Sequence, residues 1–178
     1  MKLYGQDIGF RRSIWAENEL KKTAPDGDVR TALTAMTSED PMERSNAMLT
    51  FCATMHSADE RFRKWRARCE GTEYKETGWT KEDWENLTEE ETAKAIQEAL
   101  KEWNGDAKQE VEAEPVGKEL TATEYLFYGH MMNMNEEEVW NATIGHMADL
   151  VNCLAIYRGA ARKKKRKHWT FDEAIELE

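Results

Sequence analysis

The most apolar stretch of the chain, residues 120–159, constrains the fold most strongly, because it combines helix-start signals with a long apolar face. Asn135 and Glu138 have the spacing of a capping box, in which two side chains satisfy the first free N–H groups of a helix. Thr143 offers a second cap, and Gly159 offers a left-handed stop. Between Thr143 and Gly159, apolar residues recur at steps of three and four, which predicts one face of a helix. These residues are Ile144, Met147, Leu150, Val151, Leu154 and Tyr157.

Two interpretations of this apolar face are open. Periodicity alone favours an ordinary core helix, and the alternative is a docking face for a partner. A segment of about forty residues buries too little surface to be stable alone, so its apolar side must meet the rest of the chain, a second copy or another protein. On the docking interpretation, the predicted partner-binding residues are Val139, Trp140, Ile144, Met147, Leu150, Leu154 and Tyr157.

Capping residues also divide the first 105 residues into short helices, and they predict a mainly α fold. The predicted helix starts are Ser13, Asp28, Asp40 followed by Pro41, Thr80 with Asp83, and Thr88 with Glu91. A loose alternation around residues 5–7 predicts a small β-hairpin ahead of the first helix.

The helix that starts at Pro41 is the expected core helix of this half, with Glu43 placed to complete a capping box with Asp40. Its apolar stripe comprises Met48, Phe51, Cys52 and Met55. Because the stripe ends near His56, we expect this helix to end there. A separate, strongly charged helix should follow, with Gly71 as its stop.

Residues 106–120 have the composition of a flexible linker, because they are acidic, lack aromatic residues and contain proline and glycine. The sequence therefore predicts an N-terminal hairpin-plus-helices domain (1–105), an acidic linker (106–120), a C-terminal helical module (121–160) and a basic tail with a short amphipathic end (161–178).

The formal charge of the chain is −10, although one short run near its end is strongly basic. That run comprises Arg162, Lys163, Lys164, Lys165, Arg166 and Lys167. An acidic body repels phosphate, so we expect nucleic-acid binding to be confined to this tail if it occurs at all. The first ten residues are too polar for a signal peptide, and no run approaches the eighteen apolar residues of a membrane helix. Three cysteines without a CxxC pair suit a reducing cytoplasm.

No known catalytic motif is present in the sequence, which lacks GxSxG, HExxH, GxGxxG and a Walker glycine loop. Cys52 with His56, and His146 with Cys153, have spacings that place each pair on one helix face. Zinc sites normally place their ligands at tighter spacings supported by turns, so core packing is the favoured interpretation. We expect no catalytic residue, no metal and no cofactor.

Two groups of features, one near each end of the chain, occur together in this sequence. Residues 3–20, LYGQDIGFRRSIWAENEL, lead into small helices. Near the other end, residues 125–129 make an aromatic-glycine helix end, residues 136–140 an acidic helix with a tryptophan, and residues 143–157 a threonine-capped helix. With these features the chain resembles the tail assembly chaperones of long-tailed bacteriophages, in the frameshift-extended form that joins a short-form domain to a C-terminal extension. The resemblance covers most of the chain except the linker and the basic tail.

The resemblance implies a non-enzymatic chaperone with two partners. Its N-terminal domain would coat the tape-measure protein and keep the apolar stripes of that protein from aggregating. Its C-terminal extension would recruit tail-tube subunits, and self-association is also open. The implied location is the cytoplasm of the infected bacterial host, with the protein absent from the mature virion.

A second hypothesis is a small regulatory protein that binds nucleic acid or another receptor through residues 162–169. Ionic strength separates the two hypotheses, because phosphate binding weakens steeply with salt, whereas capture of an apolar helix persists.

Overall fold

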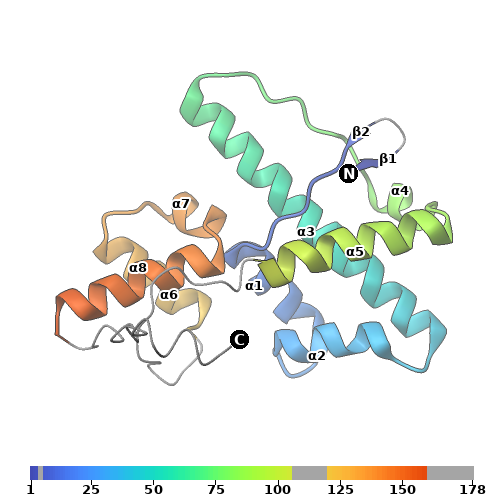
Figure 1. The fold of residues 1–178 in the computed structure, drawn as a ribbon, viewed down its shortest axis with the longest axis horizontal. Coiled ribbons are helices and arrows are strands. Elements are labelled where there is room, and N and C mark those ends of the chain that lie inside the picture. Colours follow the sequence, from blue (N-terminus) through green and yellow to red (C-terminus); the bar gives the residue numbers. More distant parts are fainter. Residues whose placement is uncertain (4–5, 106–119, 160–178) are drawn as a thin grey trace, which may run out of the picture.

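The computed structural model describes residues 1–3, 6–105 and 120–159 (Figure 1). The described part is mainly helical, with one two-stranded antiparallel hairpin at the N-terminus, which confirms the predicted fold class in outline. The hairpin pairs β1 (Lys2–Leu3) with β2 (Gln6–Asp7). The predicted linker, apart from Leu120, and the predicted basic tail lie outside the described residues.

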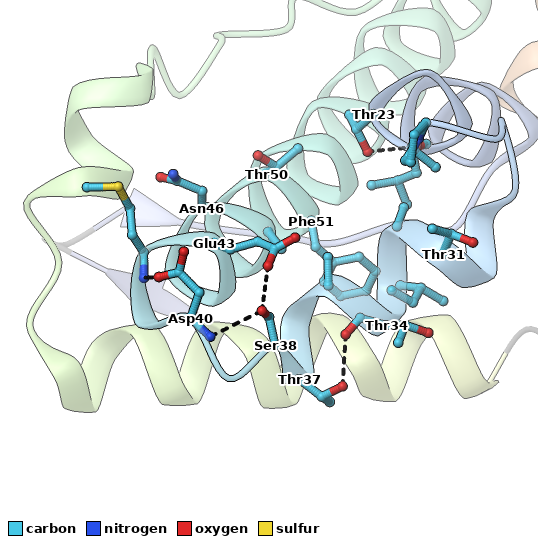
Figure 2. Close-up of a pocket in the computed structure, with 18 of the residues that line it drawn as sticks. Thr23, Thr31, Thr34, Thr37, Ser38, Asp40, Glu43, Asn46, Thr50 and Phe51 are labelled. Carbon is cyan, nitrogen blue, oxygen red and sulfur yellow. Dashed lines mark hydrogen bonds between the residues drawn. The ribbon is translucent and has the colours of Figure 1, made fainter.

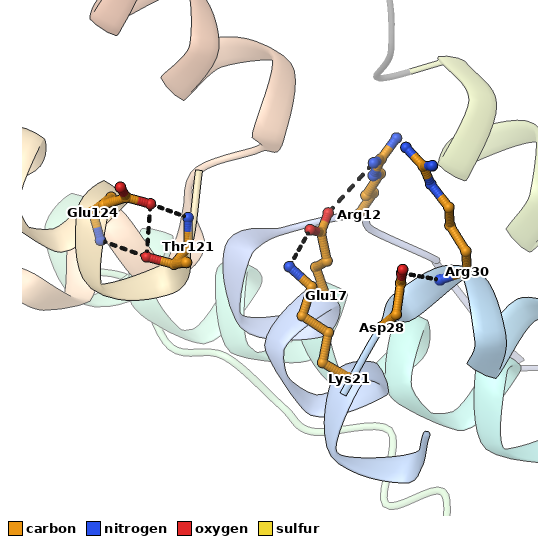
Figure 3. Close-up of polar contacts among 7 residues, drawn as sticks. All are labelled: Arg12, Glu17, Lys21, Asp28, Arg30, Thr121 and Glu124. Atoms are coloured by element: carbon orange, nitrogen blue, oxygen red, sulfur yellow. Dashed lines mark hydrogen bonds and ion pairs between the residues drawn. The ribbon is translucent and has the colours of Figure 1, made fainter. Parts of the chain in front are cut away.

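The helices are α1 (Ile14–Thr23), α2 (Val29–Thr34), the short 3-10 helix η1 (Ala35–Thr37), α3 (Pro41–Glu70), α4 (Lys81–Glu85), α5 (Glu89–Gly105), α6 (Ala122–Met131), α7 (Glu136–Asn141) and α8 (Ile144–Tyr157). The starts of α1, α2, α3, α4, α5, α7 and α8 agree with the capping residues that predicted them, whereas the starts of η1 and α6 were not predicted. In Figure 3, Asp28 accepts the backbone N–H of Arg30 at 2.8 Å, and Thr121 and Glu124 form a capping box at the start of α6.

The prediction of two helices between Pro41 and Gly71 is wrong, because α3 is one continuous helix of 30 residues. No glycine or proline follows Pro41 until Gly71, so nothing in the sequence interrupts the backbone hydrogen-bond ladder. The change from apolar to charged residues near His56 marks where α3 leaves the core. Gly71 ends the helix in a left-handed conformation at φ 67°, as predicted.

The predicted capping box between Asp40 and Glu43 is also wrong. Asp40 does cap α3 by accepting the backbone N–H of Met42 at 2.9 Å. The Asp40 N–H, however, donates to the hydroxyl of Ser38 at 3.3 Å, and that hydroxyl in turn donates to Glu43. Ser38 therefore stands between the two residues that the sequence pattern paired.

The larger hydrophobic core joins the N-terminal segment to α1, the middle of α3, and α5. The rings of Phe51 on α3 and Trp103 on α5 pack edge to face, with centroids 5.7 Å apart. Arg12 lies over the Trp103 ring at 4.2 Å and donates to the Trp103 carbonyl at 3.1 Å. It also pairs with Glu17, which in turn pairs with Lys21 at 3.0 Å (Figure 3). These contacts fix α5 across the start of α1.

The second core joins the C-terminal helices to α1, so residues 121–159 share a buried cluster with the N-terminal half. Ile14 packs with Tyr125, Val139, Ala142 and Met147 in one buried cluster. Two polar contacts reinforce this junction. The Ile14 N–H donates to the Ala142 carbonyl at 3.2 Å, and Arg11 donates to the Asn141 carbonyl at 3.1 Å. Figure 1 shows α6, α7 and α8 gathered beside α1, on the side away from α5.

The segment between α3 and α4 is held by a polar network on α3. His56 is buried, with Nδ1 3.0 Å from the Gly9 carbonyl and Nε2 3.1 Å from the Thr77 hydroxyl. Glu60 accepts both the backbone N–H and the hydroxyl of Thr77, at 2.7 and 2.6 Å. Gly9 lies so close to Asp59 that a Cβ atom there would come within 2.1 Å of a carboxylate oxygen. A side chain at residue 9 would therefore have to displace the side chains of Asp59 and Arg63 on α3.

Candidate partner-binding surfaces

The apolar face of α8 passes from the core into solvent along the length of the helix. Met147 is 0% exposed, Leu150 and Leu154 are half-buried, and Tyr157 is 89% exposed. These four residues follow one another at steps of three and four, so they lie on one side of the helix. We call Leu150, Leu154 and Tyr157 the α8 strip. The α8 strip lies on the same side of the helix as the buried Met147 and extends from it toward the C-terminal end of α8, where the core no longer covers it.

The structure divides the predicted partner-binding residues into two groups. Val139 and Met147 are fully buried inside the chain, so the core interpretation holds for them and neither can touch a partner in this structure. Trp140 and Ile144 pack at the edge of the same cluster, and Trp140 also donates its ring N–H to Glu136 at 3.0 Å. The accessible remainder of the predicted face is the α8 strip.

A close contact between α6 and α7 fixes how these two helices pack beside α8. A Cβ atom at Gly129 would lie 2.2 Å from Val139 Cγ2, far inside contact distance. Glycine therefore lets α7 pack directly against the backbone of α6, and Val139 fills the space that a side chain would occupy. The glycine of the aromatic-glycine helix end is thus a packing residue.

Phe127 on α6 is a further exposed apolar residue that the sequence analysis did not select. Its side chain is 60% exposed and packs at an angle against the ring of Tyr128, with centroids 5.7 Å apart. The sequence could have predicted this exposure from helical spacing. Phe127 follows the buried Tyr125 by two positions, which places the two side chains on opposite sides of the helix.

A groove in the N-terminal half forms a second candidate surface. It lies between the end of α1, the α2–η1 segment and the first turns of α3, and it holds about 960 Å³ of space (Figure 2). Phe51 is one of its lining residues, and Met42 on its edge is 74% exposed. The sequence analysis missed this groove, because it exists only once α1, α2 and α3 are packed together.

The groove is lined by apolar, hydroxyl, amide and acidic side chains, with no lysine, arginine or histidine among the lining residues. Its acidic residues are Glu39, Asp40 and Glu43, all at the start of α3. Several of its threonines donate their hydroxyl protons to their own helix backbone. Thr23 donates to the Leu20 carbonyl at 2.7 Å, and Thr37 donates to the Thr34 carbonyl at 2.8 Å. These walls are therefore less polar than their composition suggests, and the charge is concentrated at one end.

The cysteine and histidine pairs noted in the sequence do not form a shared site. Cys52 is buried, and burial raises the pKa of its thiol to about 12. His56 is held by Gly9 and Thr77 as described above, while Cys69 and Cys153 are exposed. Within residues 1–3, 6–105 and 120–159, no group of three His, Cys, Asp or Glu side chains is placed to hold a metal ion.

Comparison with protein-family models, curated proteins and solved structures found no match for this chain. Over the residues described, no helix has both the length and the apolar character needed to cross a membrane.

Proposed function

We propose that the chain is a non-enzymatic tail assembly chaperone of a long-tailed bacteriophage. Its N-terminal half binds the tape-measure protein, and its C-terminal helices recruit tail-tube subunits in the cytoplasm of the infected host. The observation that carries this proposal is the α8 strip, an apolar helix face that continues past its own core and ends in the exposed Tyr157.

The surface chemistry supports protein binding. The α8 helix has a single acidic residue and no lysine or arginine between Ile144 and Tyr157, although charged residues make up 34% of the whole chain. An apolar helix face with so few charged side chains suits contact with another apolar surface. Burying it in an interface removes no ionised side chain from water, so the free energy of binding includes no cost for desolvating a charge. The resemblance of residues 125–157 to the family's extension supplies the identity of the partner.

The test is co-purification of a tape-measure protein and a tail-tube protein from the same genome with the full chain, comparing wild type with Tyr157→Asp. Tyr157 is exposed, so this substitution should leave the helical circular dichroism unchanged. Loss of one buried tyrosine contact, about 1.5–3 kcal/mol, corresponds to roughly a tenfold to hundredfold weaker capture of the tube protein.

Met42→Asp is the matched control, because it places the same charge on another large, exposed hydrophobic residue in the other half of the chain. We expect Met42→Asp to capture the tube protein normally. Capture should persist at high salt, since it depends on apolar burial. Equal capture of the tube protein by wild type and Tyr157→Asp would refute the proposal that the α8 strip binds it. Retention of only nucleic acid, lost as salt rises, would favour the regulatory hypothesis instead.

A further inference from the structure

We propose that His56 carries a proton on both ring nitrogens in the folded chain, and that the second proton holds residues 72–80 against α3. Loss of that proton as the pH rises would release these residues. They run from the end of α3 to the start of α4 (Figure 1). The inference concerns the polar network between Gly9, α3 and Thr77, and it does not depend on which proteins the chain binds.

The first ring proton is fixed by the N-terminal segment. Nδ1 of His56 lies 3.0 Å from the carbonyl oxygen of Gly9. A carbonyl oxygen has no proton to donate, so Nδ1 must carry one and donate it. His56 is 3% exposed, and its ring packs against those of Trp79 and Trp84, whose centroids lie 6.5 and 5.8 Å from its own. The ring therefore takes its hydrogen-bond partners from the protein.

The second ring proton follows from the position of the Thr77 hydroxyl. This oxygen lies 3.1 Å from Nε2 of His56 and 2.6 Å from Oε1 of Glu60. Two oxygen atoms come as close as 2.6 Å when a proton lies between them. Oε1 of Glu60 also accepts the backbone N–H of Thr77 at 2.7 Å, so it acts as an acceptor toward this residue. The proton between the two oxygens therefore belongs to Thr77.

A count of protons then assigns the charge of the ring. A hydroxyl group has one proton, and Thr77 donates its proton to Glu60. Toward His56 the same oxygen can only accept, so Nε2 must donate. An imidazole ring that donates from both nitrogens is the imidazolium cation. The geometry thus places a positive charge on a buried histidine.

The groups around the ring suit a positive charge. Burial raises the pKa of Glu60, but the hydrogen bonds from Thr77, the charge of His56 and the hydrogen bond from Tyr74 together lower it by more. Glu60 is therefore an ionised countercharge, which offsets part of the cost of burying the cation. The other titratable or charged groups of this network are Asp59 and Arg63, which pair at 2.7 Å on α3, Arg11 of the N-terminal segment, the Tyr74 hydroxyl, and the Cys52 thiol one turn earlier on α3. The contact from α4 is the uncharged ring of Trp84.

Residues 72–80 depend on this network for their position. None of them is buried, and only Tyr74, Thr77 and Trp79 are half-buried. Segments with so little buried surface are the first to open. Because the attached segment needs the second ring proton, the attached state binds one more proton than the released state. Attachment therefore weakens as the pH rises.

Loss of the Nε2 proton leaves Thr77 with one proton for two acceptors. If the proton stays with Glu60, lone pairs of Nε2 and the hydroxyl oxygen face each other across 3.1 Å. If it turns to His56, two oxygen atoms are left 2.6 Å apart with no proton between them. Both arrangements are repulsive, so the contact opens.

Ring ¹⁵N spectra of the full chain test this proposal, because the ¹⁵N shift distinguishes a protonated ring nitrogen from an unprotonated one. The chain has four histidines, and His130→Gln, His146→Gln and His168→Gln together leave His56 as the single ring to observe. At pH 7 a free histidine side chain is mostly neutral. Both ring nitrogens of His56 should nevertheless be protonated at this pH.

Amide hydrogen exchange at Thr77 is the second readout, because its N–H is bound to Glu60. Exchange is measured as the pH is raised and corrected for the intrinsic effect of pH. Over the range in which the ring signals change to the singly protonated form, protection of this amide should fall about tenfold or more, the equivalent of one hydrogen bond to a charged group. The amides of α5 should keep their protection.

Thr77→Val removes the hydroxyl and keeps the shape of the side chain and the backbone N–H. In this variant Nε2 has lost its acceptor, so His56 should be singly protonated at pH 7. Glu76→Gln is the matched control, because Glu76 lies on the same segment but pairs with Lys64, outside the network. It should leave both the ring protonation and the pH dependence of Thr77 exchange as in wild type.

Three outcomes would overturn the proposal. The first is a folded wild-type chain in which His56 carries only the Nδ1 proton at pH 7. The second is a doubly protonated ring in Thr77→Val at the same pH. The third is protection of the Thr77 amide that does not change when the ring loses its second proton. The first and third are measured without Thr77→Val, so they decide the matter even if that variant does not fold.

Discussion

Gly129→Ala provides a direct test of the packing between α6 and α7. The added Cβ would lie 2.2 Å from Val139 Cγ2, whereas apolar carbon atoms pack at about 3.5–4.0 Å. Val139 is 1% exposed, so it cannot relieve the clash by moving into solvent without leaving the core. Such overpacking costs about 1–3 kcal/mol, and the better helix propensity of alanine returns about 1 kcal/mol. We therefore expect a net loss of up to about 2 kcal/mol in the free energy of unfolding.

Val139→Ala is the second arm of a double-mutant cycle. Alone, it leaves a cavity in the second core and should cost about 1.5–3 kcal/mol. In the double variant the clashing Cγ2 atom is gone, and the nearest remaining atom of residue 139, its Cβ, is 3.5 Å from the new methyl carbon. The methyl group then fills part of the cavity. The double variant should be more stable than the sum of the single effects by about 1–2 kcal/mol.

The assay is urea unfolding followed by far-ultraviolet circular dichroism and tryptophan fluorescence, with wild type and all three variants measured in parallel. Coincident transitions from the two probes would justify a two-state analysis. Additivity within about 0.5 kcal/mol would refute the reasoning, because it would mean that residues 129 and 139 do not share this space.

Two further predictions concern the N-terminal half. At pH 8 a thiol reagent should modify the exposed Cys69 and Cys153 and leave Cys52 unmodified until the chain unfolds. The reason is that Cys52 is buried, and burial raises the pKa of its thiol to about 12. Mass spectrometry of the labelled native chain checks this, and labelling of Cys52 as complete as that of Cys69 and Cys153 would contradict it. For Glu60, burial raises the pKa, but the hydrogen bonds from Thr77, the electrostatic effect of His56 and the hydrogen bond from Tyr74 together outweigh burial and leave the pKa below its usual 4.5. The stability that Glu60 contributes is therefore present above about pH 4.5 and is lost as the pH falls through its folded-state pKa. Glu60→Gln should accordingly be less stable than wild type at pH 6, and urea titrations at lower pH should show the difference shrinking.

Local chemistry explains most of what the sequence predicted about the fold. The caps at Ser13, Asp28, Thr80 and Asn135 depend on residues three or fewer positions apart, so their spacing is visible in the sequence. The continuous α3 was missed because a change of hydrophobicity was interpreted as a helix end. Periodicity reports which part of a helix is buried, whereas the backbone continues until a breaking residue such as Gly71.

The tertiary contacts were beyond the reach of the sequence patterns. Ile14 meets Ala142 across 128 positions, and no local signal links them. The face predicted on α7 and α8 contains both buried and exposed residues, and this division depends on how α1 and α6 pack against it: Val139 and Met147 lie in the cluster with Ile14 and Tyr125, and Tyr157 is left uncovered. The groove likewise depends on three elements packing together.

The junction between residues 11–14 and residues 141–142 has a consequence for synthesis. The ribosome makes Arg11 and Ile14 long before their partners, so α1 must first fold with one side lacking its final contacts. During that interval the N-terminal half presents an apolar edge that the finished chain hides. Any product that stopped before residue 120 would keep that edge permanently, and so would differ from the full chain in the surface of α1 as well as in length.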